Sequence, residues 1–345
     1  MSPLIPIQNL YYLFVYAWNR LDEGEAVDVG GTESPELADL FAKVLTGGVK
    51  HVIRRGLYRG YEPMQEETGV LRGRINIPGS MHLIARRAPR LSCEFDELTH
   101  DVLHNQILKS TISRLLSAEG LDRELAHELR LLLRVFDGVS DVRLSKLLFR
   151  NVQIHRNNSF YDFLLKVCEL ICDLTLPEEG GNEYKFVDIL RDEKKMAKVF
   201  ENFVRNFYRL EQDDYRVTPL QMRWDAKPIG GQDLSVLPWM LTDIHLESRT
   251  KRVIIDTKYY REALQESHGK RSLKSENLYQ LFAYVKNAEA KGNAYSDVEG
   301  MLLYPVVGDR LDVNFEVQGH RLRAVTIDLS QPWQRIRSDL LGLLS

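Results

Sequence analysis

Two aspartates and a lysine interrupt the segment LTDIHLESRTKRVIIDTKYY (residues 241–260), which otherwise has the pattern of two short apolar strands. An antiparallel hairpin with its turn centred between Arg249 and Thr250 would pair Asp243 with Asp256. Side chains that face each other in such a pair have Cβ atoms about 4.5–5.5 Å apart and share one face of the sheet. Lys258, two residues beyond Asp256, lies on that same face. The pattern therefore predicts a cluster of two carboxylates and one ammonium group.

Two carboxylates at this separation repel each other, so we expect a cation between them. Mg²⁺ binds through one or two carboxylates, waters and phosphate oxygens. The ion polarises a phosphoryl oxygen and supplies a nucleophile for phosphodiester hydrolysis. Lys258 would orient the water or counter charge that develops at the phosphorus. The alternative is a surface hairpin with solvated charges, but the apolar run Val253–Ile255 predicts a buried strand, at whose end an unpaired acid is costly.

The surrounding pattern predicts an α/β protein of two domains, since 345 residues are long for one core. Residues 193–208 and 275–292 have apolar side chains at helical spacing and flank the acidic hairpin, and a further apolar strand covers 300–307. The first half is predicted as α+β, with helices near 7–20, 34–56 and 99–136 and an extended hairpin between Leu57 and Pro78. A polar stretch at 150–160 places the domain boundary between residues 155 and 156.

Composition limits the cellular setting and the mode of binding. The formal net charge of −3 is unlike the basic balance of proteins that hold nucleic acid unaided, so another subunit would do much of the holding. No stretch approaches the roughly 18 apolar residues of a membrane span, and we expect a cytoplasmic protein without membrane contact. The three cysteines, Cys93, Cys168 and Cys172, are expected to be buried and reduced.

The acidic hairpin between two helices resembles the core of the PD-(D/E)xK nuclease superfamily. The resemblance implies that Asp243, Asp256 and Lys258 form the catalytic set, with Thr242 where the motif name has proline. It also implies a mixed sheet flanked by helices, and a catalytic and metal-binding role for Glu201 on the preceding helix. Two further residues, Gln280 and Tyr284, match the Gln-x-x-x-Tyr spacing of RecB-like members, which contacts DNA or orders the site.

A closer resemblance covers nearly the whole chain. The segments IPIQNLYYLFVYAWNRL, RRGLYRGY, GVLRGRINIPGSM, NLYQLFAYV and TDI…IIDTKYY, in this order, are similar to the McrC family of nuclease subunits. The resemblance implies a McrB-like AAA+ GTPase hexamer as partner, stimulation of its GTPase, and double-stranded DNA with modified cytosine as substrate. Residues 1–155 would bind the ring and 156–345 would cut DNA. The hairpin between Leu57 and Pro78 would enter the ring, with Arg72 and Arg74 as contacts.

The sequence agrees with this division of labour, because it contains no G-x-x-x-x-G-K-[ST] phosphate loop and GTP would be bound by the partner. Two alternatives stay open. One is a nuclease of the same superfamily that repairs DNA or recognises DNA structure without a GTPase. The other is a non-catalytic activator subunit whose acidic hairpin is vestigial.

Overall fold

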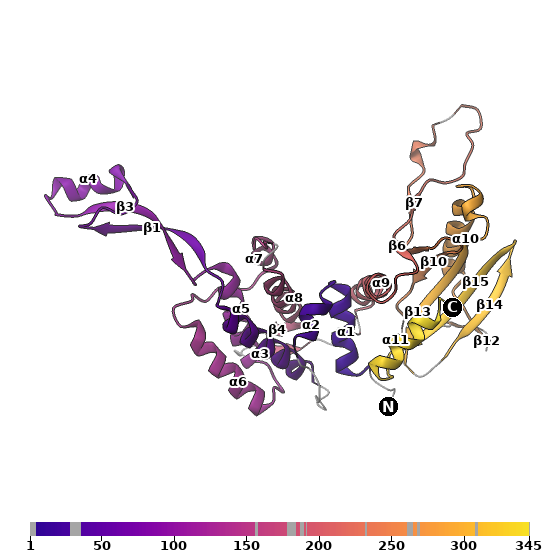
Figure 1. Cartoon of the computed structure of the whole chain (residues 1–345), viewed down its shortest axis with the longest axis horizontal. Helices are drawn as coiled ribbons and strands as arrows, with labels where there is room; N and C mark the ends of the chain where they lie inside the picture. Colours follow the sequence, from indigo (N-terminus) through magenta and orange to yellow (C-terminus); the bar gives the residue numbers. More distant parts are fainter. Residues whose placement is uncertain are drawn as a thin grey trace. The chain divides into compact units, whose positions relative to one another are not determined.

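The computed structural model describes residues 5–27, 36–155, 158–177, 184–186, 190, 192–231, 233–260, 265–267, 270–307 and 310–344. They form two compact units, which we call the sheet unit and the helical unit (Figure 1). The sheet unit contains α1 (Ile7–Ala17), α2 (Leu21–Glu25) and all elements from α9 (Glu193–Leu210) onward. The helical unit contains the elements from α3 (Leu37–Arg55) to β5 (Tyr184–Phe186).

The remaining elements of the sheet unit are β6 (Arg216–Thr218), β7 (Gln221–Met222), β8 (Met240–Leu241), β9 (Ile244–Glu247), β10 (Arg252–Thr257), β11 (Gln265–Ser267), β12 (Lys270–Ser272), α10 (Ser275–Glu289), β13 (Glu299–Val306), β14 (Asp312–Val317), β15 (His320–Asp328) and α11 (Trp333–Gly342). Six strands form one mixed sheet in the order β14–β15–β13–β10–β9–β6. The β10–β13 and β13–β15 pairs are parallel and the outer pairs antiparallel. The predicted mixed sheet with helices is therefore confirmed.

Helix α10 packs on β10 and β13, and helix α9 packs on β6 and β10. Leu281 and Val285 of α10 share a buried cluster with Ile254 of β10 and Leu302 of β13. Because β10 and β13 are covered by helices and lie inside the sheet, their sequences are nearly continuous apolar runs. Asp256 is the buried charged residue of β10.

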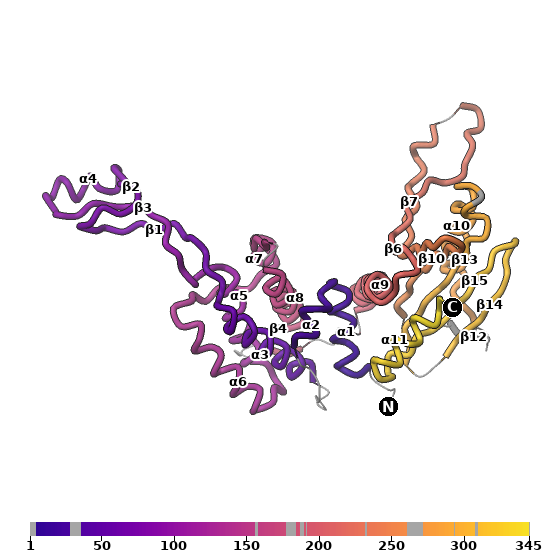
Figure 2. Tube along the Cα trace, in the orientation of Figure 1, coloured from indigo at the N-terminus to yellow at the C-terminus, as the bar shows by residue number. Residues whose placement is uncertain are grey.

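The N-terminal helix α1 packs on α9, beside it in the fold (Figure 2). Aromatic rings fill this contact: Tyr16 lies 5.9 Å from Phe203 between ring centroids, and Trp333 lies 6.0 Å from Phe203. The side-chain amide of Asn206 donates to the carbonyl of Tyr16 at 2.9 Å. The first helix of the chain therefore supports the helix that carries Glu201.

The other elements of the helical unit are β1 (Gly60–Thr68), β2 (Arg74–Ile75), α4 (Ile77–Ala85), β3 (Leu91–Thr99), α5 (Leu103–Leu116), α6 (Arg123–Leu133), α7 (Lys146–Arg150), α8 (Ser159–Leu174) and β4 (Thr175–Pro177). Helices α3, α5 and α8 pack together. At Gly48 of α3, an added Cβ would come within 2.3 Å of the Leu164 side chain, so glycine permits the close approach of α8.

This packing places α8 in the helical unit, whereas the sequence placed residues from 156 onward in the C-terminal domain. The chain passes between the units after β5, and α1 and α2 join the later half. The expected division at residues 155 and 156 therefore does not coincide with the compact units. Two long-range contacts, α8 on α3 and α5 and α1 on α9, account for the difference, and local sequence patterns report neither of them.

The predicted extended ribbon is present, but its second strand was assigned wrongly. The partner of β1 is β3, in an antiparallel ladder from the pair Gly60–Thr99 to the pair Thr68–Leu91. β2 adds only two pairs on the other side of β3. The chain does not return directly after residue 78 because the Asn76 side chain accepts a hydrogen bond from the Gly79 amide at 2.8 Å and begins α4.

Two of the three cysteines, Cys93 and Cys168, are buried free thiols, as predicted. Cys172 is partly exposed, and its Sγ accepts a hydrogen bond from the Arg114 guanidinium at 2.9 Å. Among the described residues, no helix has the length and apolar character needed to cross a membrane.

Candidate active site

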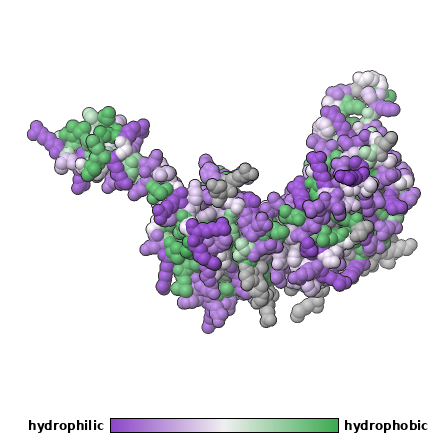
Figure 3. Space-filling view, viewed as in Figure 1, coloured by the Kyte–Doolittle hydropathy of each residue, from purple (hydrophilic) through white to green (hydrophobic). Residues whose placement is uncertain are grey.

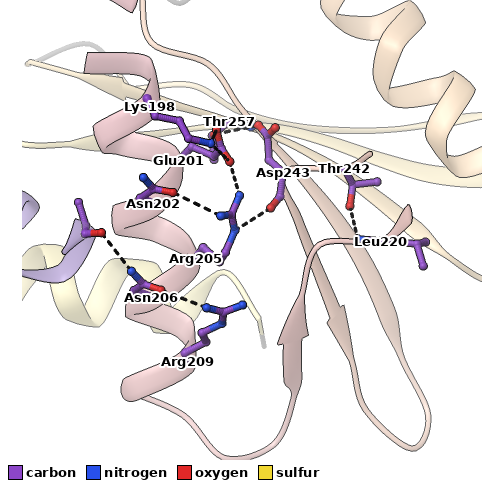
Figure 4. Close-up of polar contacts among 11 residues, drawn as sticks. Lys198, Glu201, Asn202, Arg205, Asn206, Arg209, Leu220, Thr242, Asp243 and Thr257 are labelled. Atoms are coloured by element: carbon purple, nitrogen blue, oxygen red, sulfur yellow. Dashed lines mark hydrogen bonds and ion pairs between the residues drawn. The ribbon is translucent and has the colours of Figure 1, made fainter. Parts of the chain in front are cut away.

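The hairpin register predicted from the sequence is observed. β9 and β10 pair Ile244 with Ile255 and Glu247 with Arg252. Asp243 immediately precedes β9, and the same register continued by one step sets it opposite Asp256. Figure 4 shows Asp243 at this end of the strands, facing Thr257 and α9. The two aspartates therefore meet at the point where β9 begins and β10 nears its end.

Asp256 is fully buried. Its Oδ2 lies 2.8 Å from the Lys258 Nζ, and apart from this ion pair neither carboxylate oxygen has a hydrogen-bond partner among the described residues. Burial raises the pKa of Asp256 to about 6; the Lys258 charge opposes the shift and the Asp243 charge adds to it. A buried carboxylate with so little compensation is a site at which a cation would be stabilised.

Asp243 is held more firmly. Its Oδ2 accepts hydrogen bonds from the amide and the hydroxyl of Thr257, both at 2.9 Å. Burial raises the pKa of Asp243, the Thr257 amide opposes the shift, and the nearby Glu201 charge adds to it. The carboxylate therefore keeps a fixed orientation while its second oxygen stays available to a ligand.

Lys258 is fixed by a chain of polar contacts that ends on α10. Its Nζ donates to the Gln280 Oε1 at 2.9 Å, and the Gln280 amide donates to the Tyr284 hydroxyl at 2.9 Å. Burial lowers the pKa of Lys258, but the adjacent Asp256 outweighs it and the net pKa is raised. Burial also raises the pKa of Tyr284. The structure thus brings Gln280 and Tyr284 to the predicted site and keeps Lys258 charged.

Glu201 reaches the same region from α9 but is engaged elsewhere. Both of its carboxylate oxygens accept from the Lys198 Nζ at 2.9 Å, and its Oε1 pairs with the Arg205 guanidinium. Within the described ranges, no group of three His, Cys, Asp or Glu side chains is close enough to hold one metal ion. Glu201 therefore lies near the aspartates without being gathered with them into a set of three.

The helix that presents Glu201 begins and packs as its sequence requires. The Asp192 side chain accepts from the Lys195 amide at 3.1 Å and so caps the first turn of α9. Met196, Phe200 and Phe203 recur at helical spacing and are fully buried. The opposite, polar face is therefore turned toward Asp243.

Sequence reasoning missed two residues of this site. Thr257 supplies both hydrogen bonds to the Asp243 carboxylate. Arg205 donates from Nε to the Asp243 carbonyl at 3.0 Å and pairs with Glu201. A signal for Arg205 was present, since it lies four residues after Glu201 on a helix, where opposite charges face each other.

Arg72 and Arg74 belong to the helical unit and lie beside β3. The Arg72 guanidinium stacks 4.2 Å from the centroid of the Phe95 ring, and Arg74 pairs with Glu94 at 2.8 Å. The Arg74 side chain is nevertheless 83% exposed. Both arginines belong to the helical unit, whereas the two aspartates belong to the sheet unit.

These elements define a mixed α/β protein with a buried, oxygen-rich acidic site. The sequence profile described as McrBC 5-methylcytosine restriction system component matches residues 9–305. The chain is 31% identical over 342 residues to the Type IV methyl-directed restriction enzyme EcoKMcrBC of Escherichia coli strain K12, covering 99% of this chain and 98% of that protein. This chain therefore belongs to the McrBC 5-methylcytosine restriction system component family.

A solved structure has a similar fold. It is the refined half-complex from a tetradecameric assembly of Thermococcus gammatolerans McrB AAA+ hexamers with bound McrC. The TM-score is 0.59 at 17% sequence identity, covering 97% of this chain and 76% of the matched chain. The architecture described above is thus shared over almost all of the chain.

Proposed function

We propose that this chain is the DNA endonuclease subunit of a GTP-dependent restriction complex that cleaves double-stranded DNA containing modified cytosine. The observation that carries the proposal is the register of β9 and β10, which aligns Asp243 with Asp256 beside Lys258. Family membership adds the restriction context. The reaction would be Mg²⁺-dependent phosphodiester hydrolysis.

Asp243 and Asp256 would hold the magnesium ion. Their chemistry fits this ion, because it prefers carboxylate oxygens and keeps waters and phosphate oxygens as its other ligands. The buried oxygens of Asp256, which among the described residues have only the Lys258 ion pair, supply the structural reason. When bound, Mg²⁺ would polarise the phosphoryl group and promote water as the nucleophile. Thr257 would keep the Asp243 carboxylate in one orientation throughout.

Lys258 would act as a cation. Its raised pKa keeps the ammonium group protonated near neutral pH, so it counters negative charge that develops at the phosphorus. Gln280, held by Tyr284, would fix the direction of the ammonium group. The same two residues would order the DNA strand at the edge of the site.

The partner would be an AAA+ GTPase hexamer, as in the solved complex with McrB. The β1–β3 ribbon and α4 carry an exposed apolar surface, which Figure 3 shows as a green region at the far end of this element. Its exposed apolar residues are Tyr61, Met64, Val70, Leu71, Ile75, Ile77, Met81, Ile84 and Leu98. Apolar surface of this extent marks a site of protein interaction. Docking here, with Arg72 and Arg74 at the contact, would stimulate GTP hydrolysis.

The test is reconstitution of the complete chain with its GTPase on methylated DNA, comparing the natural chain with D256A. We expect D256A to abolish cutting and to leave GTPase stimulation unchanged. Undiminished cutting by D256A would contradict the proposal and favour the activator alternative. Efficient cutting by the chain with Mg²⁺ alone would instead favour a nuclease that needs no GTPase.

A further inference from the structure

Arg205 is the only residue among those described that contacts both Glu201 and the backbone of Asp243. It lies on α9, and its side chain is 18% exposed. Its Nε donates to the Asp243 carbonyl at 3.0 Å, its Nη1 donates to the Asn202 side chain at 3.3 Å, and its Nη2 pairs with Glu201 (Figure 4). The guanidinium thus joins the helix glutamate to the start of β9.

The contacts leave Glu201 little freedom to turn toward the aspartates. One of its oxygens is paired with both Arg205 and Lys198 and the other with Lys198. Lys198 is 64% exposed, and an ion pair at such a site is weak and readily exchanged. Arg205 is different, because its bonds to the Asp243 carbonyl and to Asn202 anchor the guanidinium independently of Glu201.

We propose that Arg205 is a positioning residue that keeps Glu201 beside the aspartate pair but outside direct coordination of the metal. Asp243 and Asp256 are then the direct protein ligands, and Glu201 is a neighbouring charge balanced by Arg205. This inference rests on the proposed nuclease function. It revises the sequence expectation that Glu201 ligates the ion directly, and it agrees with the absence of a three-carboxylate cluster in the described residues.

The chain supplies a matched control one helical turn away. Arg209 donates from Nε to the Val217 carbonyl at 3.2 Å and from Nη1 to the Asn206 side chain at 3.4 Å, as Arg205 does to Asp243 and Asn202. Figure 4 shows the two Asn–Arg pairs in succession along α9. Both arginines therefore tie α9 to the backbone of a neighbouring segment, but only Arg205 holds Glu201.

The experiment measures Mn²⁺ affinity by calorimetry on the complete chain, with D256N to show that binding occurs at the aspartate site. We expect R205A to bind Mn²⁺ roughly five- to thirtyfold more tightly, because the freed Glu201 charge attracts the cation and can join it. R205K retains the charge but loses the fork of hydrogen bonds to Asp243 and Asn202, so its affinity should fall between those of the natural chain and R205A. R209A should show a similar loss of thermal stability to R205A but unchanged affinity.

The double variant E201Q/R205A should return to the natural affinity, because the freed charge is then absent. An R205A affinity equal to that of R209A, or weaker than that of the natural chain, would overturn the proposal. So would tighter binding that persists in E201Q/R205A. If the natural chain shows no binding that D256N removes, the proposed metal-dependent function itself fails, which separates the two conclusions.

Discussion

Replacing Asp256 by asparagine should stabilise the metal-free protein at neutral and alkaline pH, although it should abolish cutting. The carboxyl group is fully buried, and its pKa rises from 3.8 to about 6 on folding. A carboxyl group with a raised pKa binds more protons in the folded chain, so its contribution favours folding below about pH 4 and is lost as the pH rises through 6. A shift of two units at 1.36 kcal/mol each corresponds to about 3 kcal/mol above pH 7.

Asparagine has nearly the same shape and carries no charge, so D256N should avoid this cost. In EDTA at pH 8, we expect the sheet unit of D256N to melt roughly 5–10 °C above that of the natural chain, and the difference should vanish near pH 4. Excess Mg²⁺ should stabilise the natural chain and leave D256N unchanged.

The control is D312N in the same unit, where a hydrogen bond from Arg323 lowers the pKa of the aspartate. That substitution should give no stabilisation at pH 8. A D256N variant that is no more stable than the natural chain at pH 8, or whose advantage is the same at pH 4.5 and pH 8, would refute the reasoning.

Three further substitutions test other parts of the fold. K258A should lower the cleavage rate of the reconstituted complex by about 10²- to 10³-fold, while a filter-binding assay should show unchanged DNA affinity. Equal losses of cleavage rate and DNA affinity would contradict the role of Lys258 as a cation in the site. F203A should destabilise the sheet unit by about 3–5 kcal/mol in urea unfolding, because Phe203 is fully buried between α1 and Trp333. G73A should loosen the ribbon and reduce GTPase stimulation without changing the stability of the sheet unit. The reason is that Gly73 has φ +67° and an added Cβ would lie 2.2 Å from the Glu94 carbonyl oxygen. An unchanged rate of proteolysis in the ribbon would show that this position tolerates a side chain.

The part of the site predicted from the sequence is the part that depends on local geometry. The turn between Arg249 and Thr250 fixes the pairing of β9 with β10, and this pairing in turn fixes Asp243 and Asp256. The resemblance to RecB-like nucleases implied that Gln280 and Tyr284 belong to the site, while helical spacing predicts that they share one face of α10. Each of these relationships spans few residues, so the periods of strands and helices suffice to predict it.

The misplaced parts depend on contacts between distant segments. The partner strand of β1 lies beyond α4, and the pattern near residues 70–78 does not distinguish a strand returning to β1 from a chain entering a helix. The packing of α1 against α9 depends on rings separated by about half the chain. The spacing of Arg205 after Glu201 predicts their ion pair, but the hydrogen bond from Arg205 to the Asp243 carbonyl is not predictable from the sequence, because a main-chain acceptor can belong to any residue type.

The placement of α1 has a consequence for how the protein is made. The helical unit comes mainly from one uninterrupted stretch and can fold as soon as β5 leaves the ribosome, whereas α1 must wait for its partners α9 and Trp333. At 5–20 residues per second, roughly 300 further residues take about 15–60 s to synthesise. The rings of α1 that pack on Trp333 lack this partner during that interval, so the sheet unit is completed only when α11 has been translated. A nascent chain would accordingly complete the helical unit before the sheet unit that carries Asp243 and Asp256.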